Sequence, residues 1–180
     1  GNERFDDARR STPPVVIRAA TSDDLPALGR LGTMLVRQHH DLDGARFIPE
    51  APQTPAMYAK FPGSQLGNPD VVMLVAECDG EIVGYTVGGL EGFDYMALRG
   101  PAGVGYDLIV DLAHRGGGVG RALLDALLAA FGARGAVQGV LMTAERNDVA
   151  HRMFATAGFR RTMVEMTAEL APSGASGGRL

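Results

Sequence analysis

The residues of this sequence whose types and spacing most clearly suggest chemistry form the glycine-rich run His114-Arg115-Gly116-Gly117-Gly118-Val119-Gly120-Arg121. The run follows an apolar segment typical of a strand and precedes an apolar segment typical of a helix. Glycines at such a junction let the backbone approach a ligand closely. The unpaired N–H groups at the start of the helix, together with its dipole, favour an anion. With Arg115 or Arg121 as a charged donor, the run predicts a pyrophosphate site.

Two other phosphate-binding motifs do not fit this run. A P-loop needs Gly-Lys-Ser/Thr, whereas Gly120 is followed by Arg121 and Ala122. A dinucleotide fingerprint needs a third glycine three positions after the second, where this chain has Arg121 or Leu123. The alternative is a glycine-rich turn with no ligand. Four glycines in five positions at the start of a long apolar helix favour a ligand site.

Two motifs in this order resemble those of the GNAT-type N-acetyltransferases. Arg115-x-x-Gly118-x-Gly120, after Leu108-Ile109-Val110-Asp111-Leu112, looks like the family's pyrophosphate motif. The series Asn147-x-x-Ala150-x-x-Met153-Phe154-x-x-x-Gly158-Phe159 is similar to its second motif. Arg18-x-Ala20 resembles the usual opening of the family. The resemblance covers residues 15–170, which we treat as one N-acetyltransferase domain between an N-terminal tail (1–14) and a flexible C-terminal tail (171–180).

The resemblance implies a mixed α/β fold of the GNAT type. Its central, mostly antiparallel sheet would be splayed between the fourth and fifth strands, around Val110 and Leu141, and flanked by helices. Acetyl-CoA would bind in that opening as a co-substrate, without a metal. The cofactor-binding residues carried over from the two motifs are Ile109, Val110, Leu112, Arg115, Gly116, Gly117, Gly118, Val119, Gly120, Arg121, Asn147 and Phe154.

The same resemblance implies direct attack of a primary amine on the thioester, with backbone N–H groups polarising the carbonyl. The acceptor would be a small-molecule amine or a peptide amine. A homodimer is the expected assembly.

Two positions depart from the family pattern. Leu112 stands where the family often has proline. Phe154 stands where the family usually has a tyrosine whose hydroxyl protonates the departing thiolate, and phenylalanine has no proton to donate. A general acid typically contributes about 10²–10⁴-fold to the rate. Phe154 therefore keeps a second hypothesis open, an acyl-CoA sensor or catalytically silent module. An enzyme using another phosphate-bearing cofactor is a third.

The attacking ammonium must also lose a proton, and the sequence offers three candidate bases. Glu91, Tyr106 and Asp107 lie on strands or strand ends that could face the opening between the strands, and any of them could act through a water. Each type is also common as a solvated or structural residue. The polar segment Gln38-His39-His40-Asp41-x-Asp43 is either a polar helix end or, with Arg46 and Phe47, a wall of the acceptor pocket. It does not suit a metal site, because adjacent histidines point to different faces of a helix.

The elements that position these residues follow from apolar periodicity. Strands are expected at 15–19, 71–77, 82–87, 106–112, 137–143 and 159–170, with a tight turn at Asp79-Gly80. Tyr106, Leu108, Val110 and Leu112 are expected on one face of their strand. Helices are expected after residues 22–24, at 120–131 and at 148–157, with a short helix around 56–60 in a segment, 41–70, whose pattern is otherwise unclear.

The length and composition fit a single globular domain. The chain has 180 residues, of which 46% are hydrophobic and 21% charged, with a net charge of −4. An acidic balance without a basic cluster argues against a nucleic-acid partner. A single cysteine, Cys78, fits a reducing compartment. We expect a cytoplasmic protein with no membrane association, because no apolar stretch is long enough to span a bilayer.

Overall fold

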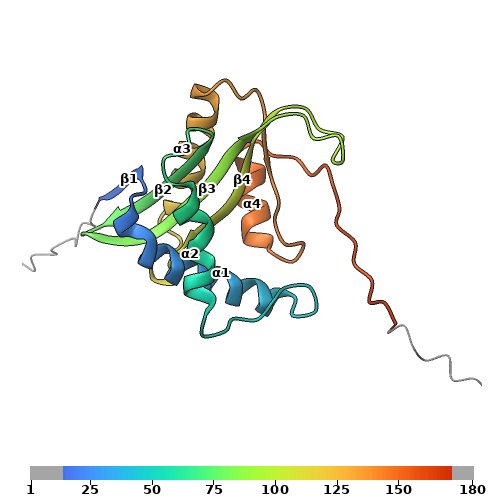
Figure 1. Ribbon diagram of the computed structural model, residues 1–180, viewed down its shortest axis with the longest axis horizontal. Coiled ribbons are helices and arrows are strands. Elements are labelled where there is room, and N and C mark those ends of the chain that lie inside the picture. Colours follow the sequence, from blue (N-terminus) through green and yellow to red (C-terminus); the bar gives the residue numbers. More distant parts are fainter. Residues whose placement is uncertain (1–13, 172–180) are drawn as a thin grey trace, which may run out of the picture.

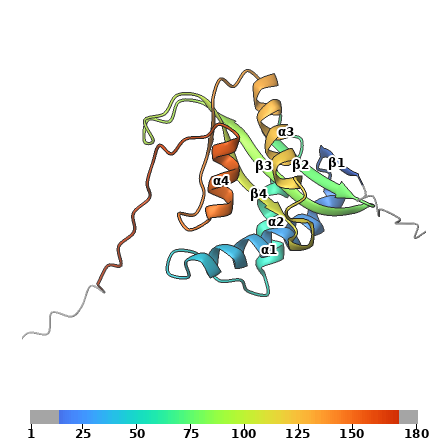
Figure 2. The same cartoon turned by 180° about the vertical axis from the view of Figure 1, so that it is seen from behind.

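A five-stranded mixed sheet with helices on both faces forms the body of the protein (Figure 1; Figure 2). The computed structural model describes residues 14–171, so most of the predicted N-terminal tail and all but one residue of the predicted C-terminal tail lie outside it. The strands lie in chain order, antiparallel from β1 to β4 and parallel between β4 and β5. Their bounds are β1 Val15–Ala19, β2 Val71–Cys78, β3 Glu81–Glu91, β4 Ala102–Val110 and β5 Gly139–Leu141.

Two helical layers cover the sheet. On one face, α1 (Leu25–Leu42) and α2 (Thr54–Gln65) cover a cluster that contains Leu28, Tyr85 and Ile109. On the other face, α3 (Val119–Ala133) covers a cluster that contains Val83 and Leu123. Figure 2 shows α3 and α4 (Asp148–Thr156) together on this second side. Because strand side chains alternate between faces, neighbouring strand residues serve different cores.

Several sequence expectations are confirmed. The β2–β3 hairpin turns at Asp79 and Gly80, whose φ angles are 50° and 78°, and Asp-Gly suits a turn with two positive φ values. The helices predicted after residues 22–24, at 120–131 and at 148–157 are present as α1, α3 and α4. The predicted short helix at 56–60 is part of the longer α2, which begins with a proline in its first turn.

The sheet opens between its fourth and fifth strands, as predicted. Pairing of β4 with β5 runs only from Gly103↔Gly139 to Gly105↔Leu141. Beyond Gly105, β4 continues for five residues beside β3 alone, among the residues described. The free edge of β4 is therefore the edge that faces the opening, and the fold class expected from the sequence is confirmed.

One predicted strand is wrong. Residues 160–171 have no regular secondary structure and no strand partner within the described chain, although the segment alternates apolar and polar residues. Both views show it running away from the body (Figures 1 and 2). A strand pattern becomes a strand only when another strand pairs with it, and no described strand pairs with this segment.

Candidate active site

The glycine-rich turn forms the N-terminus of α3. Gly116 and Gly118 have φ angles of 82° and 84°, in the left-handed region that favours glycine. Gly118 is the N-cap, and its carbonyl accepts the first helical hydrogen bond from the Ala122 N–H at 3.0 Å. A Cβ placed on Gly116 or Gly118 would meet no atom within 4 Å. The turn is thus open on its outer side, where the first N–H groups of a 15-residue helix point.

The two arginines that flank the turn are held by neighbouring residues. Arg115 donates from Nε to the Val110 carbonyl at 3.0 Å and from Nη2 to Oε1 of Gln38 at 2.8 Å. Partial burial lowers the pKa of Arg115. Arg121 donates to Asp125 at 2.8 Å, four residues along the same helix. Arg115 therefore connects the end of β4 to α1, while Arg121 lies over the first turns of α3.

The other residues of the predicted cofactor site have varied surroundings. The Ile109 side chain is buried against α1, and Val110 and Val119 pack with the core beneath α3. Gly120 lies within ordinary contact distance of Met153, which brings α4 beside the turn. Leu112 is exposed in a short 3₁₀ helix, Leu112–His114. These positions line the end of β4 and the start of α3 together.

The second motif forms the start and middle of α4. Asn147 is the N-cap, and its side-chain oxygen accepts a hydrogen bond from the Ala150 N–H at 3.1 Å. Phe154 is half-buried, with its ring 6.0 Å from that of Phe159 in an edge-on arrangement. Both residues have structural roles that the sequence pattern alone did not indicate.

A β-bulge in β4 changes which way the candidate bases point. Val87 pairs with Asp107, and the next pair is Gly88 with Gly105, so Tyr106 is the extra residue. Plain alternation would put Tyr106 on the α3 side with Leu108. Instead its ring lies 6.0 Å from that of Phe61 in α2. The predicted single face is wrong at this position, because the bulge turns Tyr106 toward α2, the side that Asp107 already faces.

Asp107 is the most enclosed of the three candidate bases. The Tyr58 hydroxyl donates to its carboxylate, and the Tyr85 hydroxyl contacts that of Tyr58. Burial raises the pKa of Asp107, an effect that the hydrogen bond from the Tyr58 hydroxyl reduces but does not cancel. Burial raises the pKa of Tyr58 far above its usual value as well. Asp107 is thus a carboxylate that takes up a proton more readily than one in water.

Glu91 and Tyr106 form a second polar group nearby. Glu91 accepts hydrogen bonds from the Tyr106 hydroxyl at 2.8 Å and from Arg99 at 3.0 Å. Burial and the neighbouring Glu91 raise the pKa of Tyr106 to about 12. The charge of Glu91 is largely offset by Arg99, so Asp107 is the candidate base whose charge has no such ion-pair partner among the described residues.

A cavity of about 310 Å³ lies between α2 and the bulged part of the sheet. Its lining is apolar apart from Tyr58 and Asp107, and consists of Met57, Tyr58, Phe61, Pro62, Val87 and Asp107. Asp107 lies two residues beyond the last β4–β5 pair, so the cavity adjoins the opening of the sheet. Its α2 residues come from segment 41–70, which the family resemblance associates with the acceptor pocket but whose pattern singled out none of them.

Two glycines of α1 explain how α2 comes to carry the wall of this cavity. A Cβ on Gly32 would lie 2.0 Å from the Tyr58 ring, and one on Gly29 would lie 2.7 Å from the Pro55 carbonyl oxygen. The backbone of α1 at Gly29 and Gly32 therefore lies directly against Pro55 and the Tyr58 ring of α2. This close approach places the Tyr58 hydroxyl over Asp107. Glycine at 29 and 32 was the only signal in the sequence that a second helix packs here.

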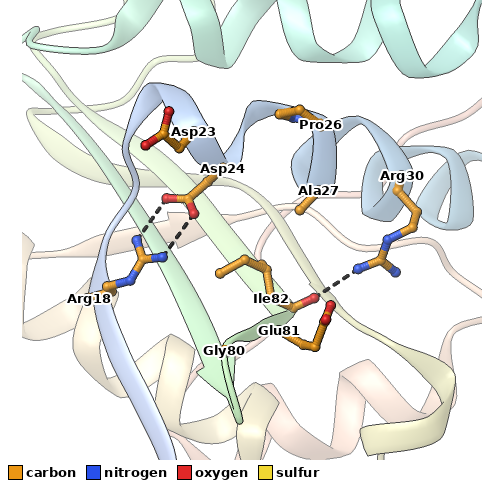
Figure 3. Close-up of a pocket in the computed structure, with 9 residues that line it drawn as sticks. All are labelled: Arg18, Asp23, Asp24, Pro26, Ala27, Arg30, Gly80, Glu81 and Ile82. Atoms are coloured by element: carbon orange, nitrogen blue, oxygen red, sulfur yellow. Dashed lines mark hydrogen bonds and ion pairs between the residues drawn. The ribbon is translucent and has the colours of Figure 1, made fainter.

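A second hollow, of about 450 Å³, lies beside the β2–β3 turn (Figure 3). Three of the charged side chains that line it are paired with neighbours: Arg18 donates to both oxygens of Asp24, at 2.8 and 2.9 Å, and Arg30 donates to the Ile82 carbonyl at 2.9 Å. The bond from Arg18 lowers the pKa of Asp24, so this pair stabilises the fold above the ordinary carboxyl pKa and loses that effect as the pH falls. We interpret the hollow as structural.

Neither a metal site nor a spanning helix occurs in the part of the chain that the structure describes. Within residues 14–171, no three His, Cys, Asp or Glu side chains are grouped so that they could hold a metal ion. No helix in the same range combines the length and apolar character needed to cross a bilayer.

The sheet thus opens beside a glycine turn at a helix N-terminus, an α/β arrangement whose geometry suits a phosphate-bearing ligand. The sequence matches the model of the Acetyltransferase (GNAT) family over residues 35–159. The chain therefore belongs to the GNAT acetyltransferase family. No curated protein matches it.

Solved structures share this fold over most of the chain. A mutant form of the BH1408 protein from Bacillus halodurans is 26% identical, with a TM-score of 0.72, covering 87% of this chain and 99% of that one. A predicted acetyltransferase from Clostridium acetobutylicum, solved with acetyl-CoA, is 17% identical, with a TM-score of 0.67 and coverage of 86% and 96%. An aminoglycoside N-acetyltransferase, AAC(6')-Iy in complex with CoA, is 15% identical, with a TM-score of 0.65 and coverage of 89% and 97%.

Proposed function

We propose that the protein transfers the acetyl group of acetyl-CoA to a primary amine, with Asp107 as the general base. The observation that carries the proposal is the position of Asp107, a partly buried carboxylate that lines a cavity beside the opened edge of β4. The glycine turn supplies the N–H groups that would hold the donor's pyrophosphate at the start of α3. The donor would lie along the β4 edge with its thioester toward the cavity.

The reaction needs a neutral amine next to the thioester carbonyl. Asp107 takes a proton from the bound ammonium, and its raised pKa suits it to that role. The amine nitrogen then bonds to the carbonyl carbon, the carbon–sulfur bond breaks, and the electron pair leaves on the CoA sulfur. The nitrogen gives up its remaining extra proton, and the thiolate takes one from solvent. The products are an N-acetylated amine and CoA thiol.

Phe154 leaves the thiolate without a tyrosine donor at this position. A CoA thiolate is a fairly good leaving group, so transfer proceeds without a general acid, but more slowly. If the position is a vacant acid site, Phe154→Tyr raises kcat, by up to the about 10²-fold that a weak general acid contributes. An unchanged kcat in a folded variant would show that protonation of the sulfur does not limit the rate.

Calorimetric titration with acetyl-CoA tests the donor site first. We expect a dissociation constant in the micromolar range, as is usual for enzyme substrates. The double variant Gly118→Asp, Gly120→Asp puts two negative charges at the turn and should abolish binding. Gly132→Asp, an exposed glycine near the other end of α3, is the matched control and should bind normally. No binding by the unaltered protein would exclude the proposed activity.

Release of CoA thiol in the presence of amines then separates an enzyme from its closest rival. Amine-dependent release that requires Asp107 supports transfer. Tight acetyl-CoA binding with no release from any amine would instead support an acyl-CoA sensor or a silent module, the alternative that Phe154 favours.

A further inference from the structure

The cavity under α2 indicates which class of amine is the acceptor. This inference goes beyond the proposed activity, on which it rests. Four of its six lining residues are Met57, Phe61, Pro62 and Val87, which offer no charge and no strong hydrogen bond. Pockets for small molecules usually combine such an apolar wall with a few polar groups that fix orientation. Here the polar groups are Asp107 and Tyr58, which touch each other.

The charge in this cavity suits a single ammonium group. Asp107 is the one acidic side chain among the lining residues. Glu91, the nearest other candidate, is paired with Arg99 and holds the Tyr106 hydroxyl. A polycation would need several carboxylates to replace its hydration, because an unpaired charge is costly to bury. An amine with one charge and an apolar remainder leaves no buried charge unpaired.

Aromatic rings complete the wall beside that charge. Phe61 and Tyr106 lie edge-on at 6.0 Å and come from α2 and the bulge of β4. An aromatic face near an ammonium adds cation–π attraction, and an aromatic ring of the ligand packs well against such a pair. We propose that the acceptor is a small primary amine with an apolar or aromatic body, its nitrogen at Asp107 and its body against Met57 and Phe61.

Thiol release with three probe amines tests this acceptor class. We expect kcat/KM for 2-phenylethylamine to exceed that for ethanolamine by more than about tenfold, because a pocket contact of a few methylenes is worth that much. Spermidine should be a poor acceptor. A preference for ethanolamine or spermidine would overturn the inference and leave acetyl transfer intact. No release with any amine would overturn the proposed function instead.

Substitutions in the wall of the cavity test whether the preference for 2-phenylethylamine arises there. Phe61→Ala should raise KM for 2-phenylethylamine about tenfold and change that for ethanolamine little. Phe93→Ala, an exposed aromatic residue between β3 and β4, is the matched control and should change neither. If Phe61→Ala does not fold, Met57→Glu, at a half-exposed position, tests the same wall of the cavity. Equal KM changes for both amines in Phe61→Ala would also overturn the inference.

Discussion

The donor side and the acceptor side of this site are built in opposite ways. The donor side is a continuous stretch, residues 115–120, in which two positive φ angles and a helix start lie within six residues. The acceptor side brings Tyr58 and Phe61 from α2 against Asp107 from β4, through a bulge and a close helix contact. The first is local backbone geometry and the second depends on tertiary packing.

This difference has a consequence for how the two sides respond to change. A local turn needs only its own residues, so distant substitutions leave it intact. An assembled cavity depends on every contact that places its parts, so a change in α1 reaches a carboxylate in β4. The following predictions test this contrast between a local donor side and an assembled acceptor side.

The largest effect is expected at Asp107. Asp107→Asn removes the proposed base and keeps the shape of the side chain, so kcat should fall about 10²–10⁴-fold. The acetyl-CoA dissociation constant should stay within about twofold, because the donor side is separate. Steady-state kinetics and calorimetry measure the two quantities. Glu81→Gln, an exposed carboxylate beside the β2–β3 turn, is the control. A comparable loss of acetyl-CoA affinity would break the contrast.

The pH dependence of kcat should carry the signature of the same carboxylate. A base works only when deprotonated, so kcat falls about tenfold for each pH unit below the pKa of Asp107. Burial raises that pKa, so the fall of kcat at acidic pH should occur at a pH above about 4, the ordinary pKa of a carboxyl group. This fall should be absent in the residual activity of Asp107→Asn. A fall that persists unchanged in that variant would assign the titration to another group.

Gly32→Val tests the tertiary dependence of the acceptor side from a distance. The new side chain would overlap the Tyr58 ring, so α2 must move and the cavity must change shape. We expect KM for the amine to rise about tenfold or more, with little change in acetyl-CoA affinity. Gly63→Ala, within α2 but in ordinary contact with Leu25, is the matched control and should be neutral. Equal effects of both substitutions would indicate general loss of stability.

The smallest effect is expected within the glycine turn itself. Gly118→Ala forces a side chain into a left-handed conformation and should lower the free energy of unfolding by about 1 kcal/mol. Gly117, whose φ is not positive, should tolerate alanine better, because its Cβ would lie 3.8 Å from the nearest atom, the His114 carbonyl oxygen. Urea denaturation measures both. Equal losses would mean that the turn is less strictly local than its φ angles indicate.

The parts of the fold that the sequence could predict are those with local signals. Asp79-Gly80 specified its hairpin, and the glycine run located the start of α3 within one residue. The opening of the sheet came from family resemblance. The segment 160–170 has a clear strand pattern, and the prediction failed because pattern carries no information about the availability of a partner.

The residues of the acceptor cavity could not be predicted from the sequence, and the reason is physical. Asp107 and Tyr106 were among the candidate bases, but adjacent strand residues normally face opposite sides, and nothing in the sequence signals a bulge between them. Tyr58 and Phe61 lie in a helix with a proline at its start and another inside, which obscured its periodicity. Their relation to β4 exists only once α1 and α2 have packed.

The close contact of α2 with α1 also bears on how such an enzyme could change over generations. Pro62 is the one residue of α2 that is fully buried, so most positions of this helix are at least partly exposed. Four of the six cavity residues nevertheless come from it. Substitutions in α2 can therefore alter which amine is accepted at small cost to folding and without touching the donor turn. The fold keeps its acyl donor constant on one element and leaves the choice of acceptor open to mutation on another.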